Sequence, residues 1–293
     1  MNNRHMIHSL SALGMLCILA SCVPYREDVP VADLQNKTPP AAEPPAPIAP
    51  PVVAAPSPIA EATVPRVAPR FLRYQASGIT FEGVSFDARS QTMKVVDQAA
   101  GPDSEFPDAA SAGKRKNAIA AINGGFFDPQ GNPLGIVISN GKRAGTWNTG
   151  SSICSGVWSV NAAGQSSIQR REALGKAGAM NARELLQAGP MLLDHGSSVS
   201  GLNATQTRTR SVLLWDGKSR WWMGCTSPCT LAALSAALEQ ASPAGWRPLH
   251  ALNLDGGSSS DLWVSSTVAG GPQNVRSFFS KPVRNFLVLV PKS

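Results

Sequence analysis

The chain has 293 residues and a formal net charge of +7 at pH 7, a length that allows one domain of the larger kind with additional segments. Its basic residues are scattered apart from two short clusters, Lys114–Lys116 and Arg170–Arg171, whereas nucleic-acid-binding proteins gather such residues on one face. Composition therefore argues against nucleic acid as a partner, and the mild positive excess suits anionic glycans, phosphodiesters or lipid head groups.

Residues 1–21 have the pattern of a secretory signal peptide. Arg4 precedes an apolar stretch, residues 10–19, that is too short to span a bilayer permanently. The Leu-Ala-Ser-Cys sequence at residues 19–22 resembles the lipobox of bacterial lipoproteins, in which the chain is cut before the cysteine and that residue is acylated. We therefore expect Cys22 to carry a membrane anchor; the alternative is an ordinary signal peptide with a chance cysteine.

The segment after the predicted cleavage site has the composition of a tether. Residues 23–70 hold 13 of the 24 prolines of the chain, and such a segment cannot bury enough apolar surface to offset the entropy lost on ordering. Val23 is not the Asp that favours retention of such lipoproteins at the inner membrane, so we expect the outer membrane of a bacterial envelope, facing the periplasm. Residues 71–293 then form one domain.

The first predicted elements of this domain are strands. Ile79–Phe86 and Thr92–Val96 alternate apolar and polar residues around a polar break at residues 87–90, which predicts a β-hairpin. A helix is predicted within residues 107–116, followed by a buried strand over residues 118–122.

The middle and the end of the domain add more strands than helices. In chain order the predictions are a strand at 134–138 ended by the turn Asn140-Gly141, a hairpin of 157–160 and 167–169, a short helix at 182–187, a strand at 191–193, a helix starting after Ser227 with Pro228 in its first turn, and a final buried strand at 283–290. Many strands with few helices predict an α+β fold, a single domain built on a mixed β-sheet with a few flanking helices.

Residues 251–260 predict a strand that stops abruptly and presents polar side chains at its end. Side chains alternate along a strand, so Leu252 and Leu254 share one face while Asn253 and Asp255 share the other. The two glycines that follow, residues 256 and 257, allow a tight turn and close approach of a ligand. The alternative is an Asx turn that merely closes the strand.

Five motifs in order resemble the phosphodiester glycosidase family over roughly residues 71–293. They are the Asn-Gly-Gly run in residues 121–127, residues 131–141, residues 187–193, the arginine segment 208–210 and the Asp255 motif. The resemblance implies hydrolysis of a sugar-1-phosphodiester. Because a phosphomonoester leaves with little help from an acid, one carboxylate and a cation that neutralises the phosphate suffice.

The resemblance assigns the carboxylate to Asp255, as nucleophile or as base toward water. In the family an Arg-Thr pair opens a strand that ends in an acidic turn. Here Asp216 marks that turn, and counting back from it places Arg210 at the position of the family arginine, with Arg208 as the second candidate. An arginine matches a phosphate with two parallel hydrogen bonds, so either residue suits the role. The alternative is an exposed charge at a strand edge.

Further site residues surround this pair. Asn123 is expected to orient the sugar or the water through its amide, and Asp128 is the best second carboxylate. Asn132 stands where family members carry Glu, which puts the acid–base assignment in doubt. The residues expected to contact substrate are Arg208, Gly124, Gly125, Phe126, Asn253, Gly256, Gly257 and Ser258, the glycines at 124 and 125 by turning backbone donors toward the ligand.

Three cysteines remain in the predicted domain. Cys154, Cys225 and Cys229 allow one disulfide, most simply between the last two, although sequence does not fix the connectivity. No metal site is expected, because His195 and His250 do not lie at ligand spacing from a cysteine. No cofactor is expected either, with a divalent cation at Asp255 as the open alternative.

Two functions from different classes follow from these features. The first is an exported, membrane-anchored glycosidase that hydrolyses a sugar-1-phosphodiester or a phosphodiester-linked envelope glycan. The second is a non-catalytic glycan-binding or envelope-organising lipoprotein. The presence of Asn132 where family members carry Glu is the feature that favours this alternative.

Overall fold

The computed structural model describes residues 66–292. The predicted signal peptide, Cys22 and nearly all of the predicted tether lie outside these residues. The first strand starts at Arg70, one residue before the predicted domain boundary. None of the helices in residues 66–292 is long and apolar enough to cross a membrane.

The described residues form three sheets. The seven-stranded first sheet consists, in spatial order, of β1 (Arg70–Ala76), β2 (Ile79–Asp87), β13 (Arg220–Thr226), β12 (Ser211–Trp215), β14 (His250–Asn253), β10 (Met191–Asp194) and β11 (Ser197–Ser198). The second contains β16 (Gln273–Arg276), β15 (Asp261–Val264), β4 (Ala120–Asn123), β17 (Asn285–Pro291) and β3 (Gln91–Asp97). The third contains β6 (Lys142–Ala144), β5 (Val137–Ser139), β9 (Glu184–Ala188), β7 (Gly156–Val160) and β8 (Ser166–Arg170).

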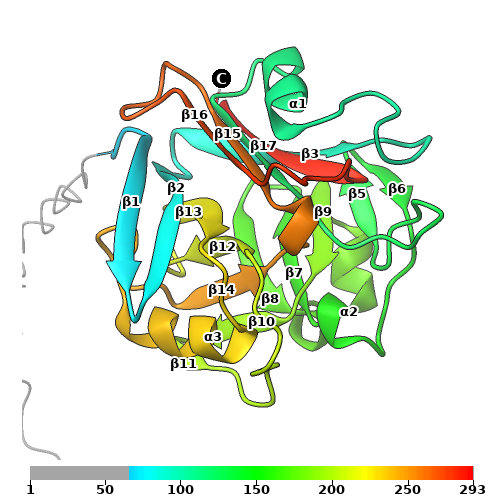
Figure 1. Ribbon diagram of the computed structural model, residues 1–293. Coiled ribbons are helices and arrows are strands. Elements are labelled where there is room, and N and C mark those ends of the chain that lie inside the picture. The colour runs from blue at the N-terminus through cyan, green and yellow to red at the C-terminus, as the bar shows by residue number, and fades with distance from the viewer. Residues whose placement is uncertain (1–65, 293) are drawn as a thin grey trace, which may run out of the picture. The chain divides into compact units, whose positions relative to one another are not determined.

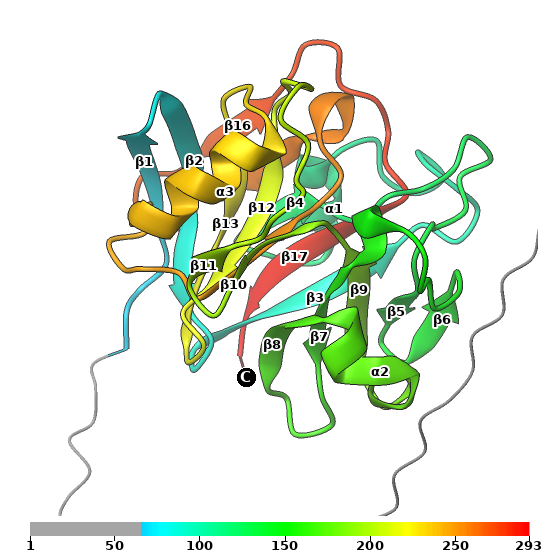
Figure 2. The same ribbon diagram turned by 90° about the horizontal axis from the view of Figure 1, so that it is seen from below.

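The three sheets enclose one common core, and one helix covers each sheet from outside (Figures 1 and 2). Helix α1 (Ala109–Arg115) packs on the second sheet, α2 (Arg171–Met180) on the third and α3 (Leu231–Gln240) on the first. Buried side chains from all three sheets meet in the central cluster, among them Trp158, Trp221, Ile122, Leu252 and Leu287. The domain is therefore held together by burial of apolar surface between sheets rather than between helices.

The predicted fold class is confirmed at the level of a single α+β domain rich in strands, and its sheet type is corrected. Every pairing between the named strands of residues 66–292 is antiparallel, so the sheets are not mixed. Parallel neighbours need long crossover connections, and this chain instead joins many neighbours through short turns.

Several local predictions are confirmed. The predicted helix at 107–116 is α1, whose N-cap Asp108 accepts a hydrogen bond from the Ser111 backbone N–H. The turn after β5 contains Asn140 and Gly141 with φ of 48° and 76°, the two positive values that a tight hairpin turn requires. The strands predicted at 118–122, 191–193 and 283–290 correspond to β4, β10 and β17.

One predicted pairing, one element type and one helix start were wrong. β2 and β3 occupy the predicted positions but do not pair, because β2 joins the first sheet and β3 the second. Residues 184–188 form strand β9, buried between β5 and β7, where tertiary pairing overrides helix propensity. Helix α3 is capped by Thr230, whose side chain accepts the Ala233 N–H, and so starts later than Pro228.

The predicted disulfide is also wrong, since all three cysteines of the described domain carry free, buried thiols. Cys225 lies in the central core cluster, whereas Cys229 lies in the separate cluster under α3. Cys154 lies against Gly135 of the third-sheet region. The short spacing of Cys225 and Cys229 in sequence therefore does not bring their sulfurs together.

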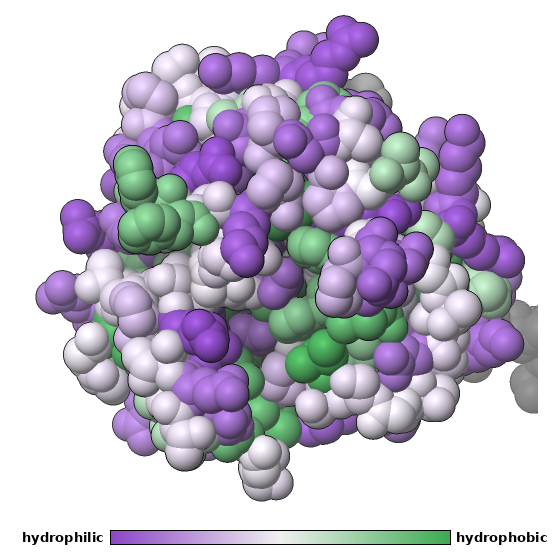
Figure 3. Space-filling view, turned by 45° about the vertical axis from the view of Figure 1, so that its right-hand side comes forward, coloured by the Kyte–Doolittle hydropathy of each residue, from purple (hydrophilic) through white to green (hydrophobic). Residues whose placement is uncertain are grey.

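The surface carries few hydrophobic residues. Hydrophilic and intermediate residues cover most of the face in Figure 3, and the hydrophobic ones gather in one group on the left and a larger one near the centre. Large apolar side chains that are well exposed include Phe278 and Phe279, at 96 % and 80 % exposure, in the loop between β16 and β17. Isolated exposed apolar groups are common, but an adjacent aromatic pair is a candidate for ligand contact.

Candidate active site

The strand that ends at Asn253 leads into the expected turn, and Asp255 opens that turn. The Asp255 carboxylate accepts a hydrogen bond from the backbone N–H of Gly256 at 2.9 Å, and the Ser259 hydroxyl donates to it as well. The residue is half-buried. Burial raises the pKa of Asp255 above its usual range, against the opposing effect of these two donors. This carboxyl therefore combines partial access with a perturbed pKa, as acid–base and nucleophilic groups often do.

Asn123 is fully buried and holds the Asp255 backbone in place. Its Nδ2 donates to the Asp255 carbonyl at 2.6 Å. Its Oδ1 accepts the Ser211 hydroxyl at 2.6 Å and the Asp261 N–H at 3.2 Å. With these partners and no exposed surface, the amide cannot reach a sugar or a water nucleophile. The prediction of direct substrate contact is corrected: Asn123 is a positioning residue.

Gly124 and Gly125 also serve packing rather than ligand contact. A Cβ on Gly124 would lie 2.0 Å from Asn285 Oδ1, and one on Gly125 would lie 3.2 Å from Leu186. The Gly124 N–H donates to the Asn285 carbonyl, and the Gly125 N–H donates to Asn285 Oδ1, both at 2.8 Å. Their donors are used inside the protein, which corrects the prediction that they face the substrate.

Asp128 forms a turn and does not supply a second catalytic carboxylate. Its Oδ1 accepts the N–H groups of Gln130 and Asn132 at 2.9 and 2.8 Å, and its Oδ2 accepts the Asn132 amide at 3.1 Å. The hydrogen bonds from Asn132, above all, lower the pKa of Asp128, opposite to what a general acid needs. Phe126 nearby is partly buried, and its carbonyl accepts the Leu134 N–H.

Arg210 lies beside the Asp255 turn, but most of its guanidinium is occupied. The side chain is buried, with Nε donating to the Cys229 carbonyl at 3.1 Å and Nη2 donating to the Gln206 carbonyl at 2.6 Å. Burial is the main cause that lowers the pKa of this arginine. Arg210 therefore acts first as a brace between two loop segments.

Arg208 is exposed and lies over the same turn. Its Cδ is 3.3 Å from where a Cβ on Gly257 would be, and no side-chain hydrogen bond or ion pair of Arg208 occurs within residues 66–292. Both arginines thus lie beside the turn on the same segment, and the guanidinium of Arg208 has fewer hydrogen-bond partners in the protein than that of Arg210. The sequence ranking of Arg210 over Arg208 is reversed by these surroundings.

The remaining predicted contacts form the turn itself. The Gly257 N–H donates to the Thr209 carbonyl at 2.8 Å, and a Cβ on Gly256 would lie 2.8 Å from the same oxygen. Ser258 is exposed beside them. Asn253 is buried and donates to the Gly189 and Leu254 carbonyls, so it positions the strand end. Close packing explains why this turn requires glycine.

Three residues that sequence reasoning missed complete the surroundings of Asp255. Ser211 and Asn285 bond Asn123 and Gly125 from distant strands, and the Ser258 carbonyl accepts the N–H of Lys281 at 2.8 Å. The last contact ties the loop that carries the exposed Phe278 and Phe279 to the Asp255 turn. No local pattern signals these contacts, because each joins strands or loops far apart in sequence.

A separate cavity of about 820 Å³ has a basic lining and contains none of the predicted site residues. Lys94, Lys116, Arg183 and Lys292 line it together with the buried Glu184. Glu184 uses both oxygens to accept backbone N–H groups. The cavity has basic walls but no available catalytic carboxylate, so the candidate site remains at Asp255.

A family model described as phosphodiester glycosidase matches residues 116–290. The chain belongs to the phosphodiester glycosidase family. The matched region includes Asn123, the arginine segment and Asp255, which confirms the resemblance seen in the sequence. A search of curated protein sequences finds no match.

Solved structures support the same fold. The catalytic domain of zebrafish N-acetylglucosamine-1-phosphodiester alpha-N-acetylglucosaminidase, auto-inhibited by its pro-peptide, is 17 % identical, with 79 % of this chain and 85 % of that chain covered at a TM-score of 0.56. A hypothetical protein from Synechocystis is 18 % identical, with 76 % and 61 % covered at a TM-score of 0.53. At these identities the similarity concerns the fold.

Proposed function

We propose that this protein is an exported, membrane-anchored glycosidase that hydrolyses a sugar-1-phosphodiester of the N-acetylglucosamine type or a related phosphodiester-linked envelope glycan. Cys22 would carry the lipid anchor, at the outer membrane facing the periplasm. The observation that carries the enzymatic part is the contact between the Asp255 turn and the arginine segment, through the Gly257 N–H to the Thr209 carbonyl. This contact joins the turn that carries the half-buried Asp255 to the segment that carries Arg208 and Arg210.

The chemistry follows from this arrangement. The ionised Asp255 attacks the anomeric carbon or activates a water, while Arg208 neutralises the phosphate that departs. A phosphomonoester is a good leaving group, so the reaction does not need a second carboxylic acid, in agreement with the structural role of Asp128. Phe278 and Phe279, tied to the turn through Lys281, offer apolar surface for the sugar or the aglycone.

The test is an assay in which the purified protein is given a GlcNAc-α-1-phosphodiester and the released phosphomonoester is measured. We expect Asp255→Asn to lower kcat by about 10³-fold or more, as loss of a nucleophile or base does. Asp103→Asn, on an exposed turn, is the matched control and should retain full activity. Equal activity of wild type and Asp255→Asn would reject the assignment.

A second function, glycan binding without cleavage, is favoured by one observation. Asn132, at the position where family members carry Glu, only bonds Asp128 within a turn and offers no proton for catalysis. Wild-type protein that binds the phosphodiester in calorimetry but releases no product, with affinity unchanged in Asp255→Asn, would support this second function.

A further inference from the structure

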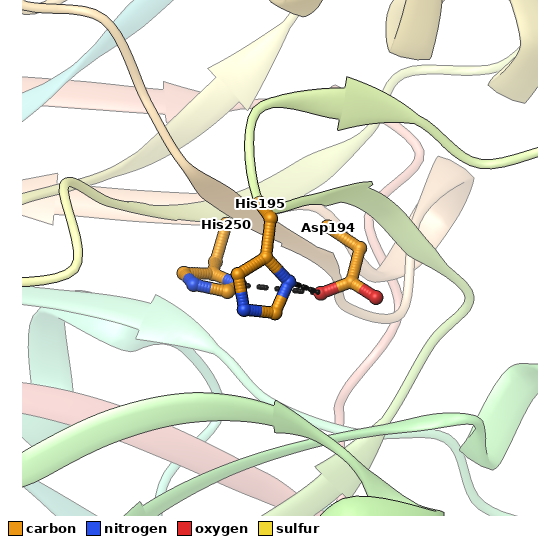
Figure 4. Close-up of side chains that lie close together, drawn as sticks. All are labelled: Asp194, His195 and His250. Carbon is orange, nitrogen blue, oxygen red and sulfur yellow. Dashed lines mark ion pairs between the residues drawn. The ribbon is translucent and has the colours of Figure 1, made fainter.

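Two histidines and an aspartate meet in the first sheet, where β10 ends beside the start of β14. Asp194 ends β10, His195 follows it in the turn to β11, and His250 begins β14. Because β10 and β14 run antiparallel with Leu193 opposite Ala251, Asp194 and His250 become neighbours although 56 positions separate them in the chain. Figure 4 shows both rings turned toward the Asp194 carboxyl group.

The potential ligand atoms are close together. Asp194 Oδ1 lies 3.0 Å from His195 Nδ1 and 3.6 Å from His250 Nδ1, and each of the three residues offers one ligand atom that lies within 4.8 Å of the other two. Ligands about 2.1 Å from a tetrahedral zinc ion are about 3.4 Å apart. The His195 side chain is 83 % exposed, so rotation of this ring can close the widest pair without moving the core.

The other side of the cluster is fixed by packing. His250 is buried, and its Nδ1 has no hydrogen-bond partner within residues 66–292. Its ring packs on Trp215, with centroids 5.2 Å apart, which holds the nitrogen toward Asp194. A buried polar atom without a partner costs free energy, and a bound cation would satisfy it.

Arg170 sets the orientation of the carboxylate. Its Nε donates to Asp194 Oδ2, which leaves Oδ1 for the cluster, as outer partners do around metal ligands. The arginine charge opposes a cation, so the affinity should be moderate rather than that of a closed four-ligand site.

We propose that Asp194, His195 and His250 bind one divalent transition-metal ion of the zinc class, through two imidazole nitrogens and one carboxylate oxygen. This donor set suits Zn²⁺, Co²⁺ or Ni²⁺, with water in the remaining positions. β14 runs from His250 to Asn253 and Asp255 follows its far end, so the strand alone separates the ion from Asp255 by about 10 Å at 3.3 Å per residue. The ion therefore stabilises the pairing of β10 with β14 and takes no part in hydrolysis, so the inference stands apart from the proposed function.

The test uses the purified protein stripped of metal with a chelator, then titrated with Co²⁺ and Zn²⁺. We expect one equivalent of Co²⁺ to give visible absorption and saturating Zn²⁺ to raise Tm by several degrees, since a ligand that binds only the folded state stabilises it. His195→Gln alters an exposed side chain and should weaken binding at least about 10-fold while the metal-free Tm stays unchanged.

Asp103→Asn, which changes an exposed carboxyl group outside the cluster, is the control and should bind as the wild type does. His250→Gln should abolish the Co²⁺ absorption. The inference is overturned if the wild type takes up no Co²⁺, or if uptake persists undiminished in both His195→Gln and His250→Gln. The substitutions of His195 and His250 should not change the rate of phosphodiester hydrolysis measured without added metal. This readout separates the test of the metal site from the test of the proposed function.

Discussion

At the scale of the residue, the site separates groups that act from groups that position. Asp255 and Arg208 are accessible, whereas the side-chain N–H groups of Asn123 and Arg210 donate to backbone carbonyls. Polar residue types alone do not reveal this division, because a buried amide and a substrate-binding amide look the same in a sequence. Burial and the list of partners distinguish them.

Substitution of Asp255 by Asn should lower the activity and raise the stability of the protein. Burial raises the pKa of Asp255 in the folded protein, so the charged carboxylate destabilises the fold relative to the neutral acid. This destabilisation is absent below about pH 4 and develops as the pH rises through the raised pKa. We expect Asp255→Asn to raise Tm by about 2–4 °C at pH 7 and to have little effect near pH 4. Scanning calorimetry of both proteins across this pH range measures the difference. A lower Tm of the variant at pH 7 would contradict the argument.

The two arginines should give opposite results on substitution. Arg208→Ala should lower kcat/KM by about 10²-fold with a change in unfolding free energy within about 0.5 kcal/mol. Arg210→Ala should cost about 2–3 kcal/mol, since it leaves two carbonyls without their charged donor. Kinetics and denaturant unfolding of each variant provide the check, and Arg208→Lys should fall between wild type and Arg208→Ala because it keeps the charge without the fork. An inactive but fully stable Arg210→Ala would restore the original ranking.

At the scale of the element, the contacts that matter join different sheets. Glu184 of β9 accepts the Val95 N–H of β3 at 2.9 Å and the Asn140 N–H at 3.1 Å. One buried carboxyl thus links the third sheet to the second. The same logic explains the failed hairpin prediction, because the polar break after β2 sends the chain to another sheet instead of back along the first.

Loss of the Glu184 carboxyl should loosen this connection. Glu184→Ala leaves two backbone donors without an acceptor, and we expect it to lower the unfolding free energy by about 2–4 kcal/mol. Hydrogen exchange at Val95 and Asn140 should accelerate more than exchange in the first sheet. Glu105→Ala, at an exposed loop position, is the matched control and should leave both measurements unchanged.

At the scale of the whole molecule, a core shared by three sheets replaces disulfides as the source of stability. The three thiols of the described domain are free and buried. Burial raises the pKa of Cys154 to about 11 and that of Cys225 to about 12, and it also raises the pKa of Cys229. Thiols with such pKa values carry little thiolate at pH 7 and stay inert.

Thiol titration measures this protection directly. In a variant with Cys17→Ser and Cys22→Ser, we expect no reaction of the native protein with a thiol reagent at pH 7 on the time scale of minutes, and three equivalents after unfolding in guanidinium. A yield of one equivalent in the unfolded, unreduced protein would mean that a disulfide does form, against the structure.

The sequence by itself determined the family, the strand-rich α+β class, the turn at Asp255 and most strand positions, because alternation, turn residues and short motifs are local signals. Only the tertiary structure decided which strands pair, that Asn123, Gly124, Gly125 and Asp128 support the fold, that the cysteines stay apart, and that Asp194 and His250 meet. Those outcomes depend on packing and register between segments far apart in the chain, and a local pattern carries no information about which distant surface it will meet.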